Sequence, residues 1–243
     1  MTAIFHILVS YPLYNGLILL IKLFPFFDAG VIVIIFTIIV KLILLPLSIK
    51  VSRSQLEMKA HEKALNNIKE KYKDNKEEQG KKTIEYYKEK GINPFASIFI
   101  LLIQLPIILG LYRVLLKYGL PMINTSILYP FISPPTATVN MVFLHIINIG
   151  DKSIILALIA GITTYFQISL ATASVATSAT KDTQGDIARA MTTQMKYVFP
   201  VVVAIISYSI SAALSIYWIT SNVFAILQEI YIKRKYHKTV FVE

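Results

Sequence analysis

Residues 31–48 have the sequence VIVIIFTIIVKLILLPLS, and this stretch decides how the rest of the chain is interpreted. A helix that crosses a bilayer needs roughly 20 mostly apolar residues, each advancing about 1.5 Å. Lys41 interrupts the run on the order of 12–16 Å from either end of such a helix. Placing a lysine at that depth costs about 2.5–3.5 kcal/mol on insertion scales. We therefore expect Lys41 to face water or a polar partner rather than lipid.

The composition predicts an all-α, polytopic membrane protein. Of the 243 residues, 55% are hydrophobic and only 16% are charged, and the apolar residues are gathered in long runs. The sequence contains no cysteine, which excludes disulfides, thiol catalysis and thiolate metal sites. The net charge of +10 is concentrated in residues 50–90 and 233–238. This distribution places both segments in the cytoplasm and favours a polyanionic or anionic-lipid partner.

The order of apolar and charged segments predicts five transmembrane helices with an N-terminal interfacial helix and a cytoplasmic helical hairpin. An odd number of spans, with the N-terminus outside and the C-terminus in the cytoplasm, puts both basic segments on the cytoplasmic side. The expected segments are an interfacial helix at 1–29, transmembrane helix 1 at 30–50, the charged hairpin at 51–92, transmembrane helix 2 at 93–117, an extracytoplasmic loop at 118–153, transmembrane helix 3 at 154–171, a cytoplasmic loop at 172–196, transmembrane helices 4 and 5 at 197–232 and a basic cytoplasmic tail at 233–243.

The N-terminal apolar stretch is bracketed by Pro12 and Pro25. Roughly 13 residues between the prolines make about 20 Å of helix, which is short of the ~30 Å hydrocarbon core. Tyr14 and Lys22 suit a helix that lies in the membrane interface. A cleaved signal peptide is the weaker alternative because no positive segment precedes the apolar run. An additional span is a further alternative.

Residues 51–91 are dense in lysine and glutamate and predict two charged helices with a break at Asp74 and Asn75. Only a thin apolar seam would hold the two helices together, so we expect the hairpin to be mobile. The residues of this predicted seam are Leu56, Leu65, Ile68, Tyr72, Ile84 and Tyr87.

Polar side chains recur at helical spacing within the predicted spans. Thr37, Lys41 and Ser48 share one helix face because they are four and seven residues apart. Small polar residues in membrane helices usually join neighbouring helices, at about 0.6–2 kcal/mol each, and this is the simpler explanation for single Ser and Thr residues. The other polar stripes comprise Ser97 and Gln104, Thr163 or Thr164 with Gln167, and Ser211, Ser215, Trp218 and Asn222.

Lys41 has no acidic residue near it in the predicted spans. Glu229 lies near the cytoplasmic end of the last span, and the remaining acidic residues lie outside the spans. Contact with water is then the least costly way to keep the lysine charged. We infer a water-filled concavity, lined by the polar stripes, whose positive charge suits an anionic guest.

Other functions have less support in the sequence. Proton- or cation-coupled transport usually needs acids inside the membrane, and no pair of broken helices recurs in two halves. His6, His61, His145 and His237 are scattered without a catalytic or metal-binding spacing, so we expect no enzyme, cofactor or metal site. A small anion channel or transporter that uses Lys41 as its anion site is the main alternative, and a passive assembly scaffold is another.

The chain resembles the YidC/Oxa/Alb family of membrane protein insertases along nearly its whole length. The resemblance implies five spans, a hairpin after the first span, and a hydrophilic groove open to cytoplasm and lipid but closed outside. It also implies that Lys41 stands where the groove has its basic residue, and that Gln167 and Trp218 line the groove. The stretches that carry the resemblance are IIFTIIVKLILLPLSIK, IKEKYKDNKEEQGKKTIEYYKEKGINP, LLIQLPIILGLYRVL and SAALSIYWITSNVFAILQEIYIKRK.

Lys41 also marks a departure from the family pattern, which usually has arginine there. Lysine keeps the charge but lacks the planar fork that holds a carboxylate through two hydrogen bonds. The resemblance is to a minimal bacterial member, without a large extracytoplasmic domain before the first span. It implies an insertase and chaperone in the bacterial inner membrane, with nascent membrane proteins and the lipid bilayer as partners and no DNA partner. The ribosome and the Sec translocon are further candidate partners.

These inferences give three sets of candidate residues. The predicted groove residues are Thr37, Lys41, Ser48, Gln104, Thr164, Gln167, Ser215, Trp218 and Asn222. The hairpin residues expected to recruit clients or partners are Lys59, Lys63, Lys69, Lys71, Lys73, Lys81 and Lys82. The tail residues, which either contact ribosomal RNA or only mark the cytoplasmic side, are Lys233, Arg234, Lys235 and Lys238.

Overall fold

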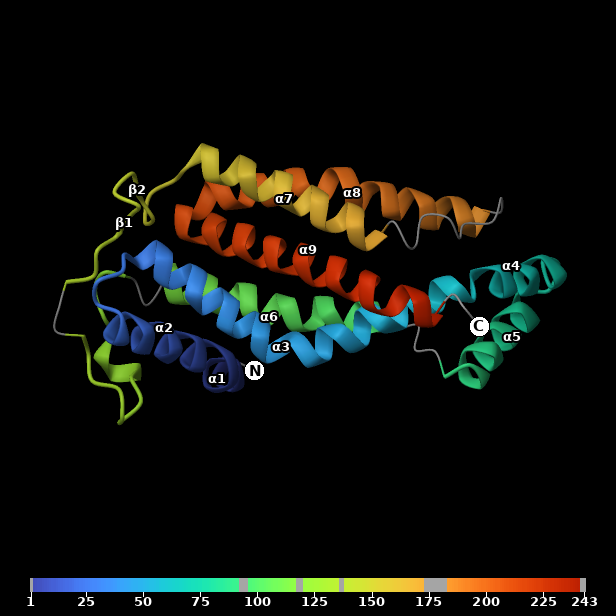
Figure 1. The fold of residues 1–243 in the computed structure, drawn as a ribbon, viewed down its shortest axis with the longest axis horizontal. Coiled ribbons are helices and arrows are strands. Elements are labelled where there is room, and N and C mark those ends of the chain that lie inside the picture. The colour runs from blue at the N-terminus through green and yellow to red at the C-terminus, as the bar shows by residue number, and fades with distance from the viewer. Residues whose placement is uncertain (1, 92–95, 117–119, 136–137, 173–182, 241–243) are drawn as a thin grey trace. The chain divides into compact units, whose positions relative to one another are not determined.

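The computed structural model is mostly helical and describes residues 2–91, 96–116, 120–135, 138–172 and 183–240 (Figure 1). The chain divides into two compact units. One unit comprises Met1–Ile43, Leu101–Thr164 and Pro200–Phe224, and the other comprises Leu44–Ile100, Tyr165–Phe199 and Ala225–Glu243. The helices are α1 (Thr2–Phe5), α2 (Tyr11–Leu23), α3 (Ala29–Ala60), α4 (Glu62–Lys71), α5 (Lys76–Glu89), α6 (Ala96–Leu116), α7 (Ile154–Thr172), α8 (Thr183–Ile210) and α9 (Ala212–Val240), with a π-helical turn η1 (His6–Ser10) and a 3-10 turn η2 (Thr125–Ile127). Two short antiparallel strands, β1 (Val142–Phe143) and β2 (Ile147–Asn148), complete the elements.

Within the described residues, four helical stretches are long and apolar enough to cross a membrane. They are His6–Leu23, Ala29–Ala60, Ile154–Ala171 and Thr193–Ile210. The last three overlap the predicted first, third and fourth spans, which confirms the expectation of a helical, multi-pass membrane protein. The predicted second and fifth spans fall in α6 and α9, and the count of five spans stays a prediction.

The N-terminal region forms a longer helical segment than the prolines predict. Pro12 lies in the first turn of α2, where its missing N–H is not needed, and the chain before it continues as η1. Tyr14, Leu17 and Ile18 of α2 are fully buried in the core of the first unit. The segment therefore packs against the protein along one face. By length and composition it also qualifies as a span, so that alternative stands beside the interfacial helix.

Polar contacts fix α2 to the loop that follows α6. Asn15 donates a hydrogen bond to the carbonyl of Ile127 at 2.9 Å and accepts one from the backbone N–H of Tyr129 at 2.7 Å. The hydroxyl of Tyr14 accepts a hydrogen bond from the backbone N–H of Asn124 at 2.8 Å. These bonds satisfy polar groups that the apolar core would otherwise leave unpaired.

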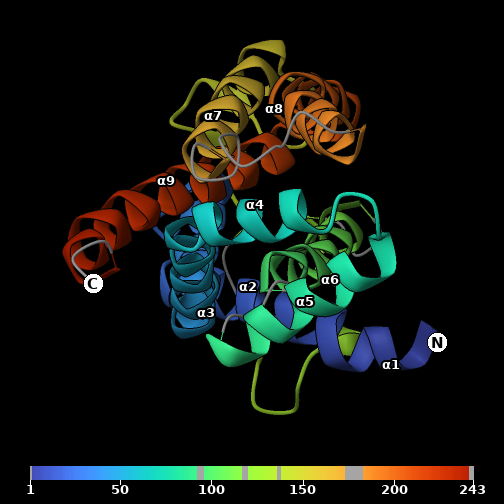
Figure 2. The same ribbon diagram turned by 90° about the vertical axis from the view of Figure 1, so that its right-hand side faces the viewer.

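Helices α7 and α8 are neighbours (Figures 1 and 2), and within the first unit they approach closely at Gly161. A methyl group added at Gly161 would lie 3.0 Å from the carbonyl oxygen of Pro200 and 3.1 Å from Cβ of Ala204. Small residues at such a crossing let two membrane helices approach one another. Helix α8 then ends at Ile210 and α9 begins at Ala212, so the chain breaks at Ser211, where the sequence predicts the final turn.

Helices α4 and α5 form a hairpin in the second unit (Figures 1 and 2). The side-chain amide of Gln79 donates to the carbonyl of Lys69 at 2.6 Å, and Nδ1 of His61 lies 2.8 Å from the hydroxyl of Tyr86. Residues 51–60, predicted as part of the hairpin, instead continue α3, since most residues of this stretch are good helix formers and it contains no glycine or proline.

The apolar seam of the hairpin is thinner than predicted. Leu56 and Leu65 are buried, as the pattern predicts, and Ile68, Tyr72 and Tyr87 are half-buried. Ile84 is 57% exposed, so its assignment to the seam is wrong. Only residues three or four apart share one face of a helix. Because α4 is only ten residues long, α5 does not bury all of its apolar side chains against it.

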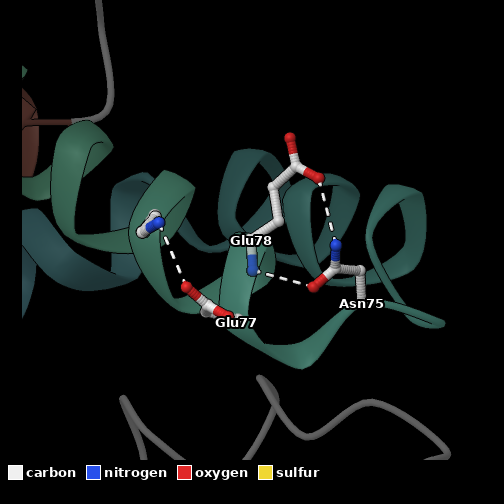
Figure 3. Close-up of polar contacts among 4 residues, drawn as sticks. Asn75, Glu77 and Glu78 are labelled. Carbon is white, nitrogen blue, oxygen red and sulfur yellow. Dashed lines mark hydrogen bonds and ion pairs between the residues drawn. The ribbon is translucent and has the colours of Figure 1, made fainter.

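Asn75 caps the start of α5 at the predicted break (Figure 3). Its side-chain oxygen accepts a hydrogen bond from the backbone N–H of Glu78 at 3.1 Å, and its amide donates to the Glu78 carboxylate at 3.3 Å. Two residues after Asn75, Glu77 forms an ion pair with Lys81 at 3.1 Å. An asparagine cap and acidic residues in the first turn both stabilise the start of a helix.

Candidate functional site

Lys41 of α3 is held by a side chain of α6. Its Nζ donates a hydrogen bond to Oε1 of Gln104 at 3.3 Å. Nε2 of Gln104 in turn donates to the hydroxyl of Tyr217, in α9, at 2.6 Å. Three helices of the first unit are therefore joined by one chain of hydrogen bonds.

The partner of Lys41 is a neutral amide, not an acid. None of the ion pairs between described residues includes Lys41. An ammonium group has three N–H donors, of which Gln104 takes one. The amide therefore orients the ammonium without cancelling its charge, and among the side chains that the structure describes, none is recorded as an acceptor for the other two donors.

Lys41 lies between the buried and the exposed faces of α3. Thr37, one turn earlier, is fully buried, whereas Leu42 is 51% exposed and Ile43 is 70% exposed. In a membrane helix, exposed apolar side chains of this kind face lipid. The half-buried Lys41 thus adjoins a lipid-facing surface on one side and the protein interior on the other.

A second polar cluster joins α7 to α9. The amide of Asn222 donates to Oγ1 of Thr164 at 2.8 Å and to Oγ1 of Thr163 at 3.2 Å, and its nitrogen lies 3.5 Å from the carbonyl oxygen of Ala160. Thr164 and Asn222 are both buried. Two of the predicted groove residues therefore bond to one another, as polar residues that hold membrane helices together do.

The other predicted groove residues have varied surroundings. Thr37 donates to the carbonyl of Val33 in its own helix at 2.6 Å. Ser215 and Trp218 are buried in α9. In the second unit, Ser48 donates to Gln228 at 2.9 Å, and Gln167 is half-buried.

The chain matches the family model described as "60Kd inner membrane protein" over residues 20–239. The chain belongs to the YidC/Oxa/Alb family. The resemblance carried by the sequence motifs is thereby confirmed, and the similar proteins include several that are named membrane protein insertases.

Three of these insertases show how the similarity extends along the chain. A YidC of Fusobacterium nucleatum is 32% identical over 206 residues, which cover 85% of this chain and 86% of that protein. MisCA of Bacillus subtilis is 30% identical over 210 residues, covering 84% and 70%. A YidC of Francisella philomiragia is 31% identical over 211 residues, covering 86% of this chain but only 33% of the longer relative.

Within this YidC/Oxa/Alb chain, the lysines of the hairpin differ in how far their charge is compensated. Lys82 pairs with Glu85 at 2.8 Å, and this hydrogen bond raises the pKa of Lys82 and lowers the pKa of Glu85. Lys81 pairs with Glu77. Of the other lysines predicted to recruit clients, three are exposed, Lys63, Lys71 and Lys73, and two are half-buried, Lys59 and Lys69.

The first residue of the predicted basic tail is used inside the second unit. Nζ of Lys233 donates to the carbonyl of Leu170 in the last turn of α7 at 2.6 Å and pairs with Glu229 at 3.3 Å. A cation is favourable at this end of a helix. Arg234 and Lys235 are exposed, and Lys238 lies where the structure describes no side chains.

Sequence reasoning missed two of the partners described above. Tyr217 accepts the hydrogen bond of Gln104, and Gln228 accepts that of Ser48. A signal for Tyr217 was available, because a tyrosine hydroxyl inside a span needs a hydrogen-bond partner. Gln228 is likewise an amide in the last predicted span, and the polar stripes did not include it.

Proposed function

We propose that this protein is a membrane protein insertase and chaperone that inserts nascent membrane proteins and helps them fold. Membership of the YidC/Oxa/Alb family supports this function, as do the names of the relatives. The observation that carries the proposal is the orientation of Lys41 by Gln104 beside a lipid-facing surface. A charge in this position is costly, so its presence indicates a functional role.

In the proposed mechanism, Lys41 and Gln104 belong to a hydrophilic groove that is open to cytoplasm and lipid. A short hydrophilic flank of the client, often acidic, enters the groove. Its carboxylate accepts hydrogen bonds from the N–H donors of Lys41 that Gln104 does not use. The polar groove shortens the apolar distance that the flank must cross. A membrane potential that is positive outside adds about 2.3 kcal/mol per charge per 100 mV in the outward direction for an acidic flank.

The apolar segment of the client then leaves sideways into lipid. Leu42 and Ile43 are exposed next to Lys41, so an apolar segment released from the groove would meet an apolar surface and then the acyl chains. Burial of its apolar side chains away from water drives this step without nucleotide hydrolysis.

In this proposal, the remaining predicted groove residues either hold together the helices that form the groove or line its surface. Thr164 and Asn222 hold α7 against α9, and Thr37, Ser215 and Trp218 pack inside the first unit. Ser48 and Gln167 are proposed to line the cytoplasmic part of the groove.

The charged hairpin and the tail are proposed to lie in the cytoplasm, with the N-terminus outside. Among the hairpin lysines, the exposed Lys63, Lys71 and Lys73 are proposed to meet the client or its ribosome first. In the tail, Arg234 and Lys235 are better candidates for ribosomal contact than Lys233, which already binds the end of α7. The Sec translocon is a further candidate partner.

Crosslinking in purified vesicles that lack every other translocation factor tests the proposal. A photoreactive group placed at Gln104 should crosslink to the hydrophilic flank of a nascent client, and one placed at the exposed Ile155 of α7 should not react with that flank. No crosslink at Gln104, combined with chloride flux through the same vesicles in the absence of client, would instead support an anion channel.

A further inference from the structure

β1 and β2 form a short hairpin (Figure 1), and the side chains at its tip are apolar. Leu144 is 57% exposed and Ile146 is 79% exposed. Leu144 and His145 have positive φ values of 49° and 61°, a conformation that is uncommon for residues other than glycine. Polar residues and glycine are the usual occupants of such turns. The backbone of this tip thus holds two apolar side chains outward.

One carboxylate ties this tip to the beginning of α3. Oδ2 of Asp28 accepts a hydrogen bond from the backbone N–H of Leu144 at 3.2 Å. Oδ1 of the same residue accepts one from the backbone N–H of Val31 at 2.9 Å, which caps the first turn of α3. The tip and the helix start are therefore held by the same side chain.

Two further contacts fix the hairpin against α3. The backbone N–H of Ala29 donates to the carbonyl of Asn140 at 2.8 Å. The ring of Phe143 lies against Gly30, where an added Cβ would come within 2.6 Å of Cγ of Phe143. No side chain fits at Gly30 without displacing the hairpin. The first turn of α3 thus sets the level of the tip, which is its position along the axis of that helix.

The link between α2 and α3 exposes apolar rings at the same end of α3. Phe26 is 73% exposed, Phe27 is 39% exposed, and their ring centroids are 4.5 Å apart. The helices on both sides of this link belong to stretches that are long and apolar enough to span a membrane. A link between two such helices lies at the membrane boundary, where aromatic side chains are favoured.

We propose that the β1–β2 tip and the Phe26–Phe27 pair form a lipid anchor that enters the headgroup and upper acyl region of the leaflet at the N-terminal end of α3. The proposal rests on the fixed level of the tip and does not depend on the insertase function. Exposed apolar side chains recur further along the same helix at Ile38 and Ile39, which makes lipid the expected occupant. Apolar side chains buried a few ångströms into this boundary are the usual anchor of peripheral segments.

The absence of cysteine from the sequence allows a clean labelling experiment. The variant Ile146→Cys is labelled with an environment-sensitive fluorophore in phosphatidylcholine vesicles, and Thr125→Cys, an exposed polar position of the same unit, is the matched control. We expect a lipid that carries a nitroxide near the top of its acyl chain to quench the label at 146 much more than aqueous iodide does. The order of the two quenchers should be reversed at 125.

Two other results would overturn the proposal. Quenching by iodide at 146 that equals quenching at 125 would mean that the tip lies in water. Protection at 146 from both quenchers would mean that protein covers the tip. Adding Gly30→Ala should displace the hairpin and reduce lipid quenching at 146 while leaving 125 unchanged; unaltered quenching would contradict a depth set by α3.

Discussion

The side-chain amide of Gln104 donates a 2.6 Å hydrogen bond to the hydroxyl of Tyr217 while its oxygen accepts from Lys41 at 3.3 Å. An amide has its donor and its acceptor on opposite sides, and because an ammonium can only donate, Lys41 faces the oxygen of Gln104 and leaves its N–H side to the hydroxyl of Tyr217. If the amide were reversed, an N–H group would point at a cation. The buried Tyr217 anchors the other side of this amide and so limits the movement of the group that holds Lys41.

Removing this hydroxyl should weaken both the fold and the site. Tyr217→Phe leaves the Gln104 amide without its acceptor, which should lower the free energy of unfolding by about 1–3 kcal/mol. Insertion of an acidic-tailed client should fall as well, because Lys41 loses its fixed orientation. Tyr208→Phe, at an exposed tyrosine, is the control and should change neither quantity. Equal effects of the two variants in thermal unfolding and in insertion assays would contradict the role of Tyr217.

Asn222 should stabilise the contact between α7 and α9. Asn222→Ala removes its hydrogen bonds to Thr164 and Thr163, and polar contacts between membrane helices contribute about 0.6–2 kcal/mol. Unfolding in mixed micelles should show a loss in this range. Ser209→Ala removes only a bond within its own helix and serves as the comparison, with little expected change. A loss no larger than that of Ser209→Ala would show that Asn222 is dispensable.

Two glycines should respond to alanine with opposite signs. Gly161→Ala places a methyl group 3.0 Å from a backbone oxygen that cannot rotate away, so overpacking should cost about 1–3 kcal/mol. Gly80→Ala meets nothing within 4 Å in the exposed helix α5 and should stabilise that helix by about 0.5–1 kcal/mol. Hydrogen exchange on the two variants distinguishes the sites. Unchanged stability of Gly161→Ala would mean that the α7–α8 approach is not tight, and a loss of stability in Gly80→Ala would contradict the open surroundings of that position.

The charged hairpin should recruit clients without holding the membrane helices together. Joining residue 61 to residue 91 by a short flexible linker removes α4 and α5, whose apolar seam is thin. The variant should keep the helical signal and thermal stability expected for the remaining chain, while its yield of inserted client falls. Unfolding of the whole protein after this deletion would instead make the hairpin a structural element.

The sequence predicts the elements that local rules govern. The apolar run around Lys41, the break at Asn75 and the break at Ser211 all follow from patterns of neighbouring residues. The extent of the N-terminal helix does not, because Pro12 terminates a helix in its interior but is tolerated in a first turn.

The pairing of side chains across helices could be predicted only in part. Helical spacing places Thr164 and Asn222 in polar stripes, yet it does not say that the two stripes meet. Which residues lie level with one another depends on how far each helix is shifted along its neighbour, and the packing of the whole unit sets that shift. For the same reason the bond between Gln104 and Tyr217 is apparent only in the structure.

A charge exchange at Lys41 tests the central claim most directly. Purified Lys41→Glu and Lys41→Arg variants are placed in vesicles without a membrane potential, and insertion is measured for two clients that differ only in an acidic or a basic flank. If the ammonium binds the flank, Lys41→Arg inserts the acidic client as the unaltered protein does, while Lys41→Glu loses the acidic client and gains the basic one. Unchanged insertion of the acidic client by Lys41→Glu would contradict the account.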